Sequence, residues 1–507
     1  MIDGARLFEL STLTAYLGLL MWIGIRAARQ VKTSLDYTVA GRDVAWVVVL
    51  STTAATMVGG GASIGSVADV YRTGITFALI TCAWHIQLIV TGLWIAPRLR
   101  GLNLLTVAEF FGQKFGEGAR QLAVLNCLIF LVGALVAQLV AMGTITQTVL
   151  DIPYPVAVLG GAAIVVYYST VGGIRAVVKT DVLQFVILVG GIGAASAYLY
   201  AQNGGFVGMA ENVDPAQFQL VNEHWSGIKI ATMFAAFLLG EMLVPPYAVR
   251  CFIARDSRQA RWGVAGGGIF LLCFLPVATC VLGLAAQSDP AVVAEIQSHQ
   301  AGGAADAQVV FPTLMRRTFP PAIAGVMIAA LIAAVMSSGD SCLSCISTIV
   351  MEDIYRATVD RQATDASLLR LGKYATLCVG GVAAVCACLF SDIVKILSFV
   401  YDFWAPTMVF PFLVGIFWYR RERVMASVVA MMSGFLAALS WRFGREYLLD
   451  YLVAQDVQID PTLIEDFQPA LFGLLVSIVA FVITLPLARK KTLGRWTEPL
   501  PATAREE

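Results

Sequence analysis

Oxygen-bearing side chains gather on one face of a hydrophobic stretch near residue 340. Ser337, Ser341 and Ser344 follow the i, i+4, i+7 spacing that places residues on one side of a helix, and Asp340 lies beside them. Oxygen ligands without histidine or thiolate suit a hard cation such as Na⁺ better than zinc or copper. Hydroxyls in a helix also bond to carbonyls four residues earlier, so the stripe alone leaves cation binding and local helix bonding both open.

Three consecutive glycines at positions 59–61 interrupt an earlier hydrophobic stretch that is rich in serine and threonine. Unwinding of a membrane helix at such a place frees carbonyl oxygens for a cation or solute. Close helix packing through Gly61 and Gly65 explains the pattern equally well. No Gly-Lys-Ser/Thr follows the glycines, which excludes a nucleotide-binding P-loop.

A proline pair, Pro245-Pro246, interrupts a later hydrophobic stretch just after Glu241. Two prolines remove two backbone donors and must bend or break the helix. Interruptions at matching positions of two halves of a chain indicate the midplane binding site of a secondary transporter. An ionisable residue beside such a break is a candidate site residue.

Two other polar residues within hydrophobic stretches have both structural and functional interpretations. Asp181 follows a Gly172-Gly173 turn, where it is either a helix-capping residue or a cation ligand at the depth of Asp340. His85 lies in the middle of its stretch, where it is either hydrogen-bonded structure or a carrier of protons.

The composition determines which elements carry these residues. Of the 507 residues, 58% are hydrophobic and only 13% are charged, against about 25% charged in soluble proteins. Several hydrophobic stretches reach the ~20 residues that cross a bilayer, and all ten cysteines lie within such stretches. The sequence therefore predicts an all-α polytopic membrane protein and excludes a soluble enzyme, a nucleic-acid binder and a secreted disulfide scaffold. Thirteen transmembrane helices are predicted, at 7–27, 44–70, 75–97, 119–149, 153–170, 180–201, 226–253, 263–286, 319–351, 370–390, 393–418, 424–442 and 468–488.

These helices form one membrane domain that comprises residues 1–507. The longest polar segments, 202–225, 287–318 and 443–467, are too short to build cores of their own. Most of the 34 lysines and arginines fall on one side of the predicted helices, which predicts an outside N-terminus, an inside C-terminus and a cytoplasmic tail at 489–507.

Together the motifs resemble those of the sodium/solute symporter family, and most of all its choline-transporter-like and pantothenate-permease-like branch. The resemblance covers almost the whole chain and rests on four motifs in order: Thr106-Val107-Ala108-Glu109-Phe110, Thr180-Asp181-Val182-Leu183-Gln184 after Gly172-Gly173, Ala334 to Ser341, and Glu352-Asp353-Ile354-Tyr355. It implies a LeuT-type five-plus-five inverted repeat preceded by one extra helix. The implied parts are the extra helix 7–27, the repeats 44–201 and 226–418, and two C-terminal helices within 424–488.

The resemblance also implies positions for sodium. A first Na⁺ would lie between the second and ninth predicted helices, held by the carbonyls of Ala55, Val58 and Ala334 and the hydroxyls of Ser337 and Ser338. Some members hold a second Na⁺, and the corresponding residues here are Asp181, Asp340 and Ser341. Because Asp340 replaces a serine of some two-sodium members, one and two Na⁺ both remain open.

The solute is expected to bind where the two interrupted helices meet. The positions that correspond to an aromatic choline cage are Met57, Ile86, Ala134 and Val244, none of them aromatic, which argues against choline. An acidic residue leaves room for an amine. The expected substrate-binding residues are Gly59, Gly60, His85, Gln138, Glu241, Val244 and Tyr401.

We therefore predict a symporter, not an enzyme, that couples inward Na⁺ movement to uptake of a small organic solute by alternating access. Its partners would be the solute and the lipid bilayer of a bacterial inner membrane, without nucleic acid, and no obligate protein partner can be inferred. One alternative is a proton-coupled transporter of the same fold that uses His85, Glu241 or Asp340 as carrier. The other is a membrane sensor that binds solute without transporting it.

Overall fold

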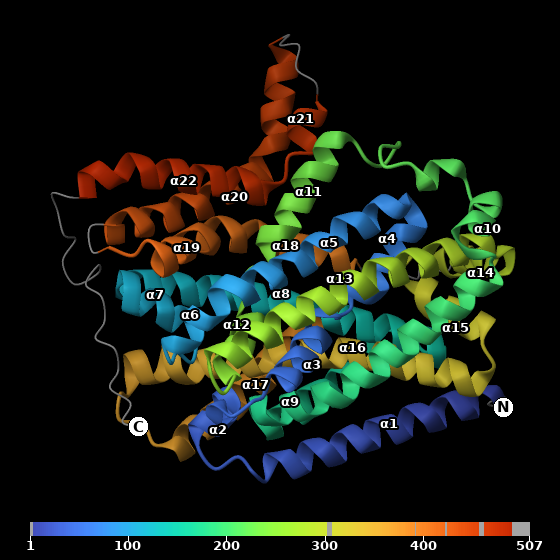
Figure 1. Ribbon diagram of the computed structural model, residues 1–507, viewed down its shortest axis with the longest axis horizontal. Coiled ribbons are helices and arrows are strands. Elements are labelled where there is room, and N and C mark those ends of the chain that lie inside the picture. The colour runs from blue at the N-terminus through green and yellow to red at the C-terminus, as the bar shows by residue number, and fades with distance from the viewer. Residues whose placement is uncertain (1–3, 302–306, 391, 421–422, 456–460, 489–507) are drawn as a thin grey trace.

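The computed structural model describes residues 4–301, 307–390, 392–420, 423–455 and 461–488, and these form a bundle of long helices (Figure 1). The predicted tail 489–507 lies outside the described residues. The described residues contain no β-strand, only isolated bridges between Val44 and Ala254 and between Asn222 and Trp225. The all-α prediction is confirmed.

The α-helices run in the order α1 (Gly4–Ala28), α2 (Ser34–Val39), α3 (Trp46–Met57), α4 (Ser66–Thr73), α5 (Ile75–Val90), α6 (Ala96–Gly101), α7 (Val107–Phe115), α8 (Glu117–Leu150), α9 (Tyr154–Gln202), α10 (Gly205–Asn212), α11 (Gly227–Gly240), α12 (Pro245–Ile253), α13 (Ser257–Ser288), α14 (Pro290–Ala301), α15 (Val310–Thr318), α16 (Pro321–Thr348), α17 (Asp365–Ala387), α18 (Ile393–Trp404), α19 (Phe410–Phe417), α20 (Val424–Ala454), α21 (Thr462–Glu465) and α22 (Pro469–Ala488). Short 3₁₀ segments lie at Ala40–Arg42, Pro215–Phe218 and Ala307–Val309, and π-helical turns at Gly61–Gly65, Thr91–Ile95, Ile349–Val359 and Ala405–Val409.

Ten of the described helices are long and apolar enough to cross a membrane, or up to twelve if each of two bent pairs is one span. The part of α9 at Tyr154–Tyr167 is a shorter apolar helix. The predicted number of thirteen and the predicted orientation remain predictions.

Two predicted boundaries differ from the structure. The helix expected at 424–442 continues to Ala454, because the residues that follow form helix without being apolar enough for a hydropathy window to include them. The helices expected at 153–170 and 180–201 are joined in α9, which kinks at Gly173 where φ is +54°. Asp181 lies two turns beyond this kink inside the helix, so its interpretation as a helix cap is wrong.

Both interrupted stretches are broken in the structure. The axis turns by 61° between α3 and the segment Gly61–Thr73, and by 44° between α11 and α12. At the second break Leu243 has φ +62°, and Pro245 starts α12 at the position where a missing N–H costs little. At the first, a Cβ on Gly60 would lie 2.5 Å from the Ala141 side chain. The glycines therefore serve both the break and the close packing.

Helix α16 is the most enclosed of the long helices. It contacts α3, α8, α9, α17 and the first helix α1. Of an apolar 18-residue segment within residues 321–359, 83% is buried inside the protein. Helix α1 lies along one edge of the bundle, beside α9 (Figure 1). The serine stripe therefore faces other helices rather than lipid.

A short helix, α2, connects α1 to α3 at one end of the bundle. Its Asp36 forms a capping box with Thr33 and an ion pair with Arg175 of α9. Partial burial raises the pKa of the Asp36 carboxyl, but hydrogen bonds from Lys32 and Thr33 and the charge of Arg175 outweigh this effect, so the pKa lies below its ordinary value. The ionised carboxylate fixes α2 against α9.

Close helix packing at Gly92 gives a testable prediction. A Cβ there would lie 2.2 Å from the backbone nitrogen of Ala265 in α13, whereas nothing lies within 4 Å of a Cβ at Gly160 in α9. We expect Gly92→Ala to destabilise the protein by about 1–3 kcal/mol through overpacking. Gly160→Ala, the matched control, should leave stability unchanged or raise it by about 0.5–1 kcal/mol. Melting temperatures in detergent check this, and equal values for the two variants would contradict the packing.

Candidate cation and substrate sites

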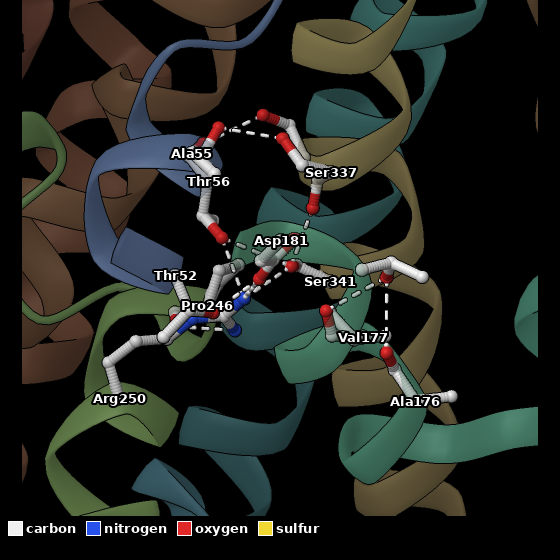
Figure 2. Close-up of polar contacts among 12 residues, drawn as sticks. Thr52, Ala55, Thr56, Ala176, Val177, Asp181, Pro246, Arg250, Ser337 and Ser341 are labelled. Carbon is white, nitrogen blue, oxygen red and sulfur yellow. Dashed lines mark hydrogen bonds and ion pairs between the residues drawn. The ribbon is translucent and has the colours of Figure 1, made fainter. Parts of the chain in front are cut away.

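The hydroxyls of α16 bond directly to the backbone carbonyls where α3 ends. Ser337 Oγ donates to the carbonyl of Ala55 at 2.7 Å, and Ser338 Oγ donates to that of Thr56 at 2.7 Å. Both also reach the carbonyl of Ala334, at 2.9 and 3.4 Å. All of these side chains are buried. Figure 2 shows Ser337 facing Ala55 across the gap between the two helices.

This arrangement fits a Na⁺ ion. Carbonyl and hydroxyl oxygens converge without a histidine or thiolate, as a hard monovalent cation requires. Val58 has ψ 62°, outside the helical range, which turns its carbonyl away from the course of α3. The structure brings Ala55, Ala334, Ser337 and Ser338 together as predicted, while the two serine hydroxyls donate to the carbonyls of Ala55, Thr56 and Ala334 rather than to that of Val58.

A small cavity of about 40 Å³ lies between the two broken helices and α8. The predicted residues that line it are Gly59, Gln138, Glu241, Val244 and Ser338. Sequence reasoning missed its aromatic wall, formed by Trp84, Phe130 and Tyr247. Only Tyr247 carried a signal, its position directly after the proline pair; the other two are ordinary aromatics in hydrophobic stretches.

Glu241 is the one carboxylate among the residues that line this cavity. Its Oε2 accepts a hydrogen bond from Tyr247 at 2.9 Å, and its Oε1 accepts one from the Tyr401 hydroxyl. Tyr401 thus stands behind the carboxylate rather than in the wall. The two tyrosines hold the carboxylate in place at the break between α11 and α12.

The remaining predicted substrate residues lie around the cavity rather than in its lining. The Gly60 amide donates to Oε1 of Gln138 at 2.7 Å, which ties the first break to α8. His85 is fully buried on α5, and its backbone carbonyl faces Gly268 of α13. His85 is absent from the lining.

An arginine that the sequence analysis did not select lies below the serine pair. Nη2 of Arg250, on α12, donates to Thr56 Oγ1 at 2.6 Å, to Ser341 Oγ at 2.7 Å and to Asp181 Oδ2 at 2.9 Å. The Asp181 carboxylate also accepts from the Thr52 hydroxyl. Figure 2 shows the guanidinium at the centre of these oxygens. The signal that could have found it was an arginine one turn beyond the proline pair.

The sodium:solute symporter family model matches residues 37–434. The chain belongs to this family. Its members are transporters, so this protein is a transporter rather than an enzyme, and Na⁺ is its cofactor.

Individual relatives resemble the chain over most of its length. It is 25% identical to the sodium/glucose cotransporter of Vibrio parahaemolyticus, covering 87% of this chain and 86% of the relative. It is 24% identical to the sodium/pantothenate symporter of Escherichia coli, covering 93% and 95%. High-affinity choline transporters also match, so the expected branch is confirmed. The relatives differ in their solutes and fix none for this chain.

A solved structure shares the fold. A Na⁺-coupled sialic acid symporter in a substrate-bound outward-open state superposes with a TM-score of 0.77 at 20% identity, covering 95% of this chain and 97% of that one. This likeness confirms the fold of the core. The division into two five-helix repeats stays a prediction.

The serine pair can be tested by direct sodium binding. A contact between a hydroxyl oxygen and a charged group contributes about 1.5–3 kcal/mol, so Ser337→Ala or Ser338→Ala should weaken Na⁺ binding roughly tenfold or more. Ser347→Ala removes a buried hydroxyl from the same helix and should leave binding unchanged. Binding of radioactive ²²Na⁺ to purified protein measures this; undiminished binding in both serine variants would overturn the assignment.

Proposed function

We propose that this protein is a secondary active symporter that couples inward Na⁺ movement to uptake of a small organic solute across a bacterial inner membrane. One observation carries the proposal. The hydroxyls of Ser337 and Ser338 bond to carbonyls at the break of α3, and the residues of that same break line the cavity beside Glu241. Cation and solute would therefore act on one movable piece of backbone.

The chain's own groups explain how the two sites communicate. Ser337 and Ser338 hold the end of α3 against α16. Gly59 lies next to the Ser338 hydroxyl, because a Cβ added to Gly59 would lie only 2.6 Å from Ser338 Oγ. Na⁺ bound at these oxygens would supply the positive charge that strengthens this attachment. The helix breaks after α3 and before α12 both lie at the cavity. A change in how either broken helix is held therefore alters the path to the cavity, as alternating access requires.

The cavity favours an amine-bearing solute. A buried carboxylate positioned by two tyrosines attracts an ammonium group, and aromatic faces add cation–π attraction. Trp84, Phe130 and Tyr247 supply such faces, although the positions expected for a choline cage are not aromatic. Gln138 adds a polar amide to the lining of the cavity. We therefore propose a small ammonium compound or zwitterion as the solute.

The driving force is sufficient with a single ion. A membrane potential of ~100 mV supplies ~2.3 kcal/mol per charge, and a tenfold Na⁺ gradient adds about 1.4 kcal/mol. Together these support a solute ratio of roughly 500 across the membrane.

Uptake into proteoliposomes tests the proposal. With purified protein and a panel of small amines and amino acids, an inward Na⁺ gradient should drive accumulation that an equal K⁺ gradient does not. Protein-free vesicles provide the control. Uptake that does not depend on Na⁺ and rises steeply with a pH gradient would contradict this proposal and support the proton-coupled alternative. Solute binding without accumulation would indicate a sensor.

The role of Glu241 can be tested with the same preparation. Removing one partner of a buried charge contact costs 2–5 kcal/mol or more, so Glu241→Gln should raise the KM for an ammonium solute roughly 30-fold or more. Glu223→Gln changes an exposed carboxylate outside the cavity and should leave the KM unchanged. An unaltered KM in Glu241→Gln would exclude the carboxylate from solute recognition.

A further inference from the structure

The side chain of Arg250 lies where the sequence analysis places a second sodium. Of the three residues expected to hold that ion, Asp181 and Ser341 both give an oxygen to the Arg250 guanidinium, at 2.9 and 2.7 Å. Thr56 gives a third oxygen at 2.6 Å. Arg250 and Asp181 are both 0% exposed.

The oxygens that face the guanidinium are thus already engaged, whereas Oδ1 of Asp181 is buried without a hydrogen-bond partner among the described residues. Ser341 Oγ accepts a hydrogen bond from Arg250, and its own hydroxyl donates to the carbonyl of Ser337 at 2.7 Å. Oδ2 of Asp181 accepts from both Arg250 and Thr52. A metal cation at the same oxygens would stand within a few ångströms of a like charge in a medium of low dielectric constant, where repulsion is strong.

Two features make the guanidinium a permanent cation. Arginine stays protonated in proteins, so its charge cannot be lost by releasing a proton. Its side chain is anchored to α12, where Nη1 donates to the carbonyl of Pro246 at 3.2 Å. Unlike a bound ion, it cannot be released to the other side of the membrane.

We infer that Arg250 replaces the second sodium, so that the protein carries one Na⁺ per solute at the Ser337–Ser338 site. Asp181 and Ser341, two of the three residues of the second Na⁺ site that the family resemblance implies, therefore do not fit that ion. This inference rests on the proposed function. The same charge joins four elements, because its partners lie on α3, α9 and α16 while its backbone belongs to α12.

Asp340 precedes Ser341 on α16 and is fully buried, and neither of its carboxylate oxygens has a hydrogen-bond partner among the described residues. A second Na⁺ held by Asp340 would give two ions per solute, and the experiment below detects it.

Ion counting in the wild-type protein tests the inference. Proteoliposomes are loaded with solute, and the Na⁺ gradient at which net solute flux stops is measured at fixed membrane potential. We expect one Na⁺ per solute and a Hill coefficient for Na⁺ near 1. A ratio of two overturns the inference while leaving sodium-coupled uptake intact; absence of any Na⁺ dependence overturns the proposed function itself.

A variant measures the same property without transport. Arg250→Ala opens a space beside Asp181 that Na⁺ can enter, so the rise of stability with the logarithm of NaCl concentration should become twice as steep as in the wild type. Guanidinium chloride at low millimolar concentration should stabilise this variant but not the wild type. In Arg120→Ala, which removes the guanidinium of a partly buried ion pair with Asp353, the slope should stay at the wild-type value. A wild-type slope in Arg250→Ala, without guanidinium rescue, overturns the inference.

Discussion

The bonds between the hydroxyls of α16 and the carbonyls at the end of α3 are the interaction on which the rest of the structure depends. A helix that breaks inside a membrane leaves carbonyl oxygens without partners, and in hydrocarbon each would cost several kcal/mol. Ser337 and Ser338 satisfy those of Ala55 and Thr56. The broken helix is therefore stable only where α16 presents hydroxyls, which places the cation site and the solute cavity side by side.

Charges inside the bundle obey the same constraint. Asp181 is paired with Arg250, Asp353 with Arg120, and Asp402 with Arg442. Each pair joins helices distant in sequence. Glu241 differs, because the side chains that donate hydrogen bonds to its carboxylate are the hydroxyls of Tyr247 and Tyr401. Among these buried acids it lies at the cavity and lacks a basic partner there, which is the condition for attracting a positively charged solute.

Much of this architecture follows from local chemistry in the sequence. The breaks at Gly59–Gly61 and at Pro245–Pro246 were predictable because these residues disfavour continuous helix. Ser337 was predictable from helical spacing and from the family resemblance, and Ser338 from the resemblance alone. Arg250, Trp84 and Phe130 were not, because nothing local separates an arginine near a helix end or an aromatic in an apolar stretch from residues that face lipid. Their roles arise only when α12, α5 and α8 pack around the breaks.

Hydrogen–deuterium exchange in NaCl and in equimolar KCl tests most directly whether sodium holds α3 against α16. Peptides that cover residues 52–61 and 330–341 should exchange more slowly in NaCl than in KCl, because the ion stabilises the backbone around the break. Peptides from α22, which lies outside this site, should exchange equally in both salts. Equal exchange of the α3 and α16 peptides in the two salts would contradict the account.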